Sequence, residues 1–226
     1  MYRLPRCVLS PSLVYCTYRL PPELNTLHAS GGTFMKEHIF HFCGPIIPKS
    51  YEYLRNQVLS ALCQQGAEKV TIMFSSEGGD LNSGFSAYNF FRGLPVPVKM
   101  VNVGTVESIA MLIYLAADER IALTSSRFLL HQFNWSYPHQ RVDYSRLNEN
   151  SNSLMFDFRR YEDIFNERTN HGNGLIDISK CLNGQSVIID AATSVNNGIS
   201  TGTLPVEGSI PPRTENTIHW WSQACF

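Results

Sequence analysis

Val96–Asp118 constrains the fold of this chain more than any other stretch, because it joins two patterns that suit different kinds of backbone. Its first part, 96–103, is short and β-branched, which predicts a strand. Its last part, 109–118, is apolar on all sides and too short to span a membrane, which predicts a buried helix. Ser108 lies at the junction. There its hydroxyl would face unpaired N–H groups at the positive end of the helix dipole, which suits a nucleophile whose reaction generates an oxyanion. The alternative is a serine that caps the helix.

The segments around this stretch alternate between strand and helix patterns. Short apolar runs predict strands, and apolar residues that recur every three or four positions predict helices. Strands and helices in this order imply parallel pairing with right-handed crossovers, so an α/β fold is expected. The predicted elements are strand 39–42, helix 50–65, strand 70–74, a helix from about Leu81 to Gly93, and short strands at 120–123 and 127–130.

Composition and charge narrow the classes of function. The 226 residues can form one domain with a sizeable core, and a hydrophobic fraction of 43% with 16% charged residues indicates a globular protein. A net charge of −1 argues against nucleic acid or a membrane as the main partner. The six cysteines show no C-x-x-C pair and no zinc spacing, which predicts reduced thiols, no metal and a cytoplasmic location. No apolar run approaches the roughly 18 residues of a transmembrane helix.

A long amphipathic helix is predicted over 143–170. Its apolar face could pack on a neighbouring subunit or on the rest of the same domain, and the pattern favours neither. That face carries Leu147, Leu154, Phe158, Tyr161 and Phe165.

The two ends of the chain have no clear periodicity. Residues 1–34 combine several prolines with arginines and short apolar pieces, and we expect a flexible or mis-assigned extension. Residues 35–202 would form the folded domain. Residues 203–226 are expected to be an irregular tail, either disordered or docked through aromatic residues such as Trp220 and Trp221.

Three blocks stand in one order along the predicted domain: Ser76–Gly79, Gly104–Ala110 and Arg127–Gln132. Together with the strand before each block, they resemble the proteolytic subunit of the Clp protease, a family of serine peptidases. The resemblance covers roughly residues 35–202. It implies a ClpP/crotonase-like α/β fold of repeated β-β-α units, with a mostly parallel sheet and a long handle helix at 143–170.

The resemblance also implies a role for each matching residue. Ser108 matches the family nucleophile and His131 the general base. Gly78 and Ile109 match the two backbone N–H donors of the oxyanion hole. The implied substrate is a peptide or unfolded protein and no cofactor is needed. The implied assembly is a homo-oligomeric ring, with an AAA+ unfoldase as a further partner.

The sequence departs from the family pattern at three positions. Glu77 stands where the family usually has proline, and Glu107 stands where a small residue usually precedes the nucleophile. Ser186 occupies the position of the catalytic aspartate. Asp190 or Asp177 could replace that aspartate from a shifted loop, and Asp190 could instead cap a short helix.

Two other classes of function stay open. One is a crotonase-type acyl-CoA enzyme, in which two backbone N–H groups bind a thioester oxygen without a serine nucleophile. The other is a catalytically weak or inactive ring component that assembles with an active paralogue. Covalent labelling of Ser108 would separate both from an active serine peptidase.

Overall fold

A computed structural model of the chain describes residues 35–134, 141, 143–174 and 176–221. All of them fall within Phe34–Phe226, one of the two units into which the chain divides. The expected extension 1–34 lies outside the described residues. The elements are β1 (Glu37–Cys43), α1 (Pro48–Gln65), β2 (Lys69–Ser76), α2 (Leu81–Arg92), β3 (Val98–Glu107), α3 (Ala110–Leu115), β4 (Glu119–Leu123), β5 (Arg127–Leu130), α4 (Tyr144–Thr169), α5 (Ile178–Leu182), β6 (Val187–Asp190), α6 (Ala191–Asn196), β7 (Gly202–Leu204) and β8 (Thr217–Trp221).

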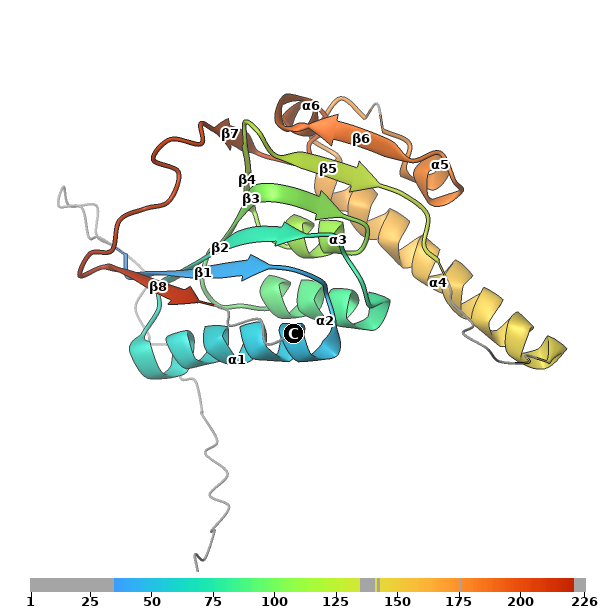
Figure 1. The fold of residues 1–226 in the computed structure, drawn as a ribbon, viewed down its shortest axis with the longest axis horizontal. Helices are drawn as coiled ribbons and strands as arrows, with labels where there is room; N and C mark the ends of the chain where they lie inside the picture. Colours follow the sequence, from blue (N-terminus) through green and yellow to red (C-terminus); the bar gives the residue numbers. More distant parts are fainter. Residues whose placement is uncertain (1–34, 135–140, 142, 175, 222–226) are drawn as a thin grey trace, which may run out of the picture. The chain divides into compact units, whose positions relative to one another are not determined.

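The strands form one mixed sheet in the order β6-β5-β3-β2-β1-β8, as Figure 1 shows. β4 branches from β3, and β7 pairs with β4. Within the described residues, every strand pair is parallel except β5 with β6. This mostly parallel sheet confirms the predicted fold class, and it leaves the carboxyl ends of β2, β3 and β5 at one edge.

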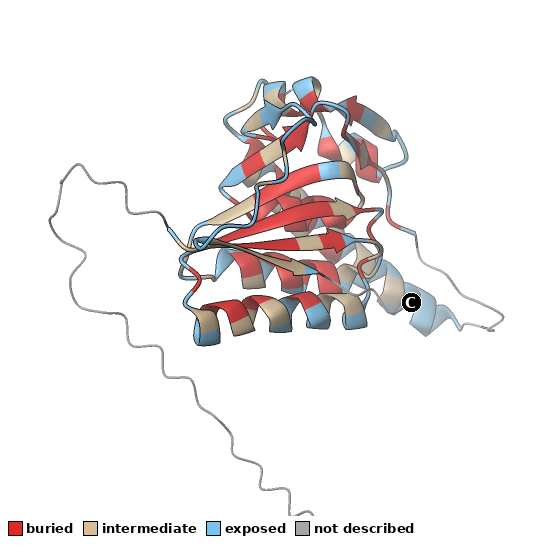
Figure 2. Ribbon diagram, turned by 60° about the vertical axis from the view of Figure 1, so that its left-hand side comes forward, coloured by how far each residue is buried: buried red, intermediate tan, exposed pale blue. Residues whose placement is uncertain are grey.

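One face of the sheet carries the main core. α1, α2 and α3 lie side by side on that face, and the C-terminal half of α4 packs beside α3 (Figure 1). The central strands and the inward sides of these helices are buried in Figure 2. β2 is buried without interruption from Val70 to Phe74, as expected for a parallel strand that is covered on both faces.

The opposite face has a smaller apolar cluster. It is made of Ile39, Met73, Val101 and Leu123. The segment after β7 runs beside this face, and the tail and the strands together line an open pocket of about 260 Å³. Part of the C-terminal tail therefore covers the side of the sheet that the helices leave open.

The expectation of an irregular tail over 203–226 is wrong at its described end. Thr217–Trp221 form β8, which adds a parallel strand to the edge of β1. The Trp220 ring stacks on Phe40 with centroids 5.6 Å apart, and its indole N–H donates to His38 Nδ1 at 2.9 Å. The tail thus docks through an aromatic residue, and it does so as part of the sheet.

The predicted long helix is confirmed as α4. Asp143 caps its start by accepting from the Arg146 N–H at 2.8 Å. Its C-terminal half buries Tyr161 and Phe165 in the core. Its first ten residues are exposed except Asn150. The N-terminal half of the helix extends away from the sheet in Figure 1. None of the described helices combines the length and apolar character that crossing a membrane requires.

Candidate active site

Ser108 occupies a strained turn between β3 and α3. Its φ is +53°, and among the described residues it alone combines a side chain with a positive φ. Such a conformation costs free energy and persists only where surrounding contacts hold it. The Ser108 N–H donates to the Leu129 carbonyl at 3.1 Å, and the Ser108 carbonyl accepts from the Met111 N–H at 3.1 Å.

Ser108 does not cap α3. The helix begins at Ala110, its N-cap is Ile109, and no side chain caps it. α3 has six residues, so its dipole contributes less than the longer helix predicted from the sequence would. The individual N–H groups near Ser108 therefore decide whether an oxyanion can be stabilised there.

The backbone of Gly78 lies directly against Ser108. A Cβ atom placed on Gly78 would stand 2.8 Å from Ser108 Cβ and 2.9 Å from the Glu107 carbonyl oxygen. The φ of Gly78 is +92°, a conformation that glycine adopts without strain. Its N–H donates to Ser76 Oγ at 3.1 Å, so this predicted oxyanion donor already has a partner.

Ile109 is the other predicted donor, and it is held from two sides. Its side chain is completely buried against Gly84 of α2, where a larger residue would collide with it. Its backbone nitrogen lies 3.4 Å from the Cβ position of Gly78. No described residue accepts a hydrogen bond from the Ile109 N–H. This N–H is therefore available on the side where Gly78 approaches Ser108.

His131 directly follows β5. β5 pairs with β3 in parallel, with Glu107 opposite Leu129, so Ser108 and His131 leave the sheet at the same edge on neighbouring strands. The His131 side chain is half-buried. Within the described residues no hydrogen bond joins Ser108 and His131, and such contacts are often loose in an enzyme without substrate.

The β5–β6 register places the candidates for the third residue. Leu130 lies opposite Val187 and Arg127 opposite Asp190. Continued one step past Leu130 and Val187, this register would set Ser186 opposite His131. Asp190 is four residues away along the ladder, which corresponds to about 13 Å.

Asp190 and Asp177 both cap short helices. The Asp190 carboxylate accepts from the Thr193 N–H at 2.8 Å, and this bond lowers its pKa. Asp177 accepts from the Lys180 N–H at 3.2 Å, which lowers its pKa, and its other oxygen pairs with Lys180 Nζ at 3.2 Å. Both carboxylates are exposed and engaged in capping, and among the described residues neither makes a hydrogen bond or ion pair with His131.

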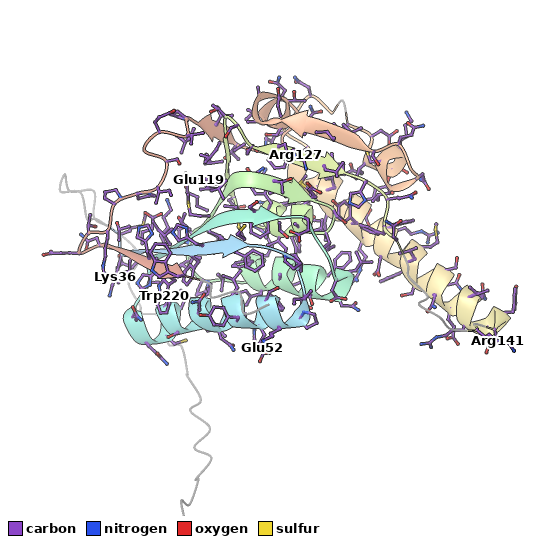
Figure 3. All side chains as sticks on the ribbon, in the orientation of Figure 1. Lys36, Glu52, Glu119, Arg127, Arg141 and Trp220 are labelled. Atoms are coloured by element: carbon purple, nitrogen blue, oxygen red, sulfur yellow. The ribbon has the colours of Figure 1, made fainter. Side chains whose placement is uncertain are left out.

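The charge of the Glu107 carboxylate is paired with neighbouring side chains. Its carboxylate accepts from Thr105 Oγ1 at 2.7 Å and from Arg127 Nη2 at 2.9 Å. Arg127 lies on β5 directly beside β3, where Figure 3 labels it. The negative charge next to Ser108 is therefore paired along the sheet. Nowhere in the described part of the chain do three or more His, Cys, Asp or Glu side chains gather as metal ligands would.

Tyr161 of α4 is part of this site and was not singled out from the sequence. Its hydroxyl donates to the Ser108 carbonyl at 3.1 Å. The sequence places Tyr161 within an apolar stripe, and the only hint of another role is that a buried phenol needs a hydrogen-bond partner.

Comparisons with known proteins give one family. The family model of Clp protease matches residues 25–197. ATP-dependent Clp protease proteolytic subunit 2 of Borreliella burgdorferi is 43% identical over 65 residues, which cover 28% of this chain and 33% of that protein. Subunit 3 of Rhizobium etli is 35% identical over 101 residues, 44% of this chain and 51% of that protein. The matched parts thus span between a third and about half of the length of these relatives.

A solved structure shares the fold. A mutant of ClpP1 from Listeria monocytogenes superposes with a TM-score of 0.61 at 19% identity, over 76% of this chain and 92% of that one. At this identity the likeness concerns the fold alone, whereas the family match extends over most of the chain. The chain belongs to the Clp protease family.

Proposed function

We propose that the chain is a serine endopeptidase that hydrolyses peptide bonds by acyl transfer. The observation that carries the proposal is the strained turn at Ser108, which is packed against the Gly78 backbone and stands beside the end of β5. Ser108 is half-buried, and a serine in such a turn can attack a carbonyl whose oxygen lies close to N–H donors.

The reaction would proceed in two stages. His131 takes the proton of Ser108 Oγ as the hydroxyl attacks the scissile carbonyl. The oxyanion accepts from the N–H groups of Ile109 and Gly78, and Gly78 exchanges its bond to Ser76 for this one. His131 then gives the proton to the leaving amine. Water, deprotonated by His131, releases the acyl group from Ser108.

A second candidate is a catalytically weak or inactive ring component. Ser186 favours it, because continuing the β5–β6 register one step past Leu130 and Val187 would set a neutral hydroxyl opposite His131. A hydroxyl can accept the imidazole N–H, but it does not offset the charge of protonated His131. We therefore expect hydrolysis to be slower than in an enzyme with a complete triad.

The proposal includes a ring of identical subunits and an AAA+ unfoldase as a partner. The exposed N-terminal half of α4 supports assembly, because an isolated helix of about ten residues is marginal in water and gains stability from a neighbour. A peptide or unfolded protein would be the substrate. Thiols at Cys43 and Cys181 that form no disulfide support the cytoplasm as the compartment.

Labelling of the purified protein with a fluorophosphonate probe tests the proposal. Label on the wild type, and none on Ser108→Ala or His131→Ala, is expected for an active Ser-His pair. Peptide hydrolysis by the double variant should be little slower than hydrolysis by either single variant, because the two residues act as a unit. A wild type that takes no label and hydrolyses no peptide would favour the inactive component. Turnover of an acyl-CoA by Ser108→Ala would favour the crotonase-type enzyme.

A further inference from the structure

Tyr161 connects the buried C-terminal half of α4 to the backbone of the proposed nucleophile. Its side chain is 1% exposed, and its hydroxyl donates to the Ser108 carbonyl, 53 positions away in sequence. Burial raises the pKa of Tyr161, so the phenol keeps its proton and remains a donor. A buried hydroxyl without a partner would be costly, so this bond constrains both groups.

The acceptor of this bond shares a peptide group with the predicted oxyanion donor. The Ser108 carbonyl and the Ile109 N–H lie in one plane and point in opposite directions, because the peptide is trans. Tyr161 and the Met111 N–H both bind the carbonyl at 3.1 Å. Fixing the oxygen on the α4 side therefore fixes the N–H on the side of Gly78.

Hydrogen bonds to the carbonyl also change the strength of the N–H. A peptide polarised at its oxygen becomes a better donor at its nitrogen, because neighbouring hydrogen bonds reinforce one another. No described residue accepts from the Ile109 N–H, so this effect is directed at whatever binds beside Ser108.

The Tyr161 ring also supports the segment that carries His131. Phe133 packs edge-on against Tyr161 with centroids 5.2 Å apart and lies at the same distance from Phe158. One side chain of α4 thus contacts both parts of the site, one through its hydroxyl and the other through its ring.

We propose that Tyr161 is a positioning residue for the oxyanion hole, which orients and polarises the Ser108–Ile109 peptide so that its N–H meets the developing oxyanion. This inference rests on the proposed acyl-transfer function. Tyr161 itself touches neither substrate nor reacting atoms. Its effect should therefore appear in the transition state and leave the binding of substrate unchanged.

The test compares two tyrosines that each lose one buried hydroxyl. Tyr161→Phe keeps the ring against Phe133 and removes only the donor to Ser108. Tyr114→Phe is the matched control, because Tyr114 is also completely buried and its hydroxyl bonds Ser200 Oγ at 2.8 Å, away from the Ser108 peptide. Peptide hydrolysis, thermal unfolding and inhibition by a peptide aldehyde, which forms a tetrahedral adduct, are measured for both.

We expect Tyr161→Phe to lower kcat roughly tenfold with KM unchanged, and to weaken aldehyde inhibition by a similar factor. Tyr114→Phe should lower Tm without either effect. A kcat that Tyr161→Phe leaves intact, or equal losses in both variants, would overturn the role of Tyr161 while leaving the proposed peptidase standing. A wild type that neither hydrolyses peptide nor forms the aldehyde adduct would overturn both.

Discussion

At the scale of single residues, Gly78 is a position of the proposed site where a side chain does not fit. Its φ of +92° and its close approach to Ser108 leave no room for a side chain. We predict that Gly78→Ala lowers kcat by roughly 10²-fold or more, because the methyl group would push the turn away from the N–H donor. Peptide hydrolysis and fluorophosphonate labelling measure the loss.

Gly66 provides the control for Gly78. It also has a positive φ, +64°, but no heavy atom lies within 4 Å of its Cβ position. Gly66→Ala should cost about 1–2 kcal/mol of stability from backbone strain and leave kcat unchanged. Equal activity in the two variants would show that Gly78 does not shape the site.

Ser186 is the residue where a substitution should increase activity. Continuing the β5–β6 register past its last pair, Leu130 with Val187, would set Ser186 opposite His131, so Ser186→Asp would supply the missing negative charge. We predict that kcat rises about tenfold, equivalent to about 1.4 kcal/mol of transition-state stabilisation. Asp190→Asn is the matched control, since asparagine caps a helix as well as aspartate does. If Asp190→Asn abolished turnover, Asp190 and not a residue at position 186 would be the acid beside His131.

At the scale of elements, β8 depends on neutral histidines of β1. His38 Nδ1 accepts from Trp220, and His41 Nε2 lies 3.0 Å from His219 Nδ1. His219 Nε2 donates to the Pro211 carbonyl at 2.9 Å, so in the neutral pair His41 donates to His219. Protonating His38 would remove the acceptor for Trp220, and protonating both His41 and His219 would place two donors face to face.

Acid should therefore loosen β8. Burial and then Lys36 lower the pKa of His38, and burial and then His219 lower that of His41. With β8 released, His38 and His41 of β1 would bind protons near the ordinary histidine pKa of about 6.5, at a higher pH than they do beneath the docked strand. Docking of β8 is therefore most stable above that pH and weakens below it. Hydrogen exchange at Thr217–Trp221 should rise between pH 7.5 and 5.5 after correction for intrinsic rates, while β2 stays protected. Unchanged protection of β8 would refute the histidine dependence.

At the scale of the whole molecule, α4 is the element most suited to join copies of the chain. Its exposed apolar side chains include Tyr144, Leu147 and Met155, which lie 82%, 47% and 49% exposed. Leu154 and Phe158, from the predicted apolar face, instead pack partly buried against the core. The apolar stripe therefore serves the domain at its C-terminal end and is available to a neighbour at its N-terminal end.

We predict that Leu147→Asp and Met155→Asp lower the mass of a homo-oligomer without unfolding the subunit. Light scattering at micromolar concentration measures the mass, and circular dichroism checks the fold. Asn152→Asp is the control, because it adds the same charge to the exposed half of α4 without removing an apolar side chain. A wild-type monomer at this concentration would contradict the prediction.

The sequence by itself determined the order and type of most elements. The expected helix 143–170 is Tyr144–Thr169, and the expected strand 70–74 lies within Lys69–Ser76. Such features follow from local side-chain periodicity, since each backbone type imposes its own repeat on the residues that face the core. The catalytic roles of Ser108 and His131 stay predictions, drawn from short blocks whose residues lie close along the chain.

Only the tertiary structure decided which distant residues meet. His41 and His219 are 178 positions apart, and the pairing of β8 with β1 has no signal in a tail without periodicity. Likewise only the antiparallel register of β6 pairs Val187 with Leu130, the residues next to Ser186 and His131, and places Asp190 opposite Arg127. Tyr161 shows the same limit, because an apolar stripe tells which side of a helix is buried but not which carbonyl its phenol will reach. These contacts depend on how complete elements pack, and local sequence patterns do not encode that packing.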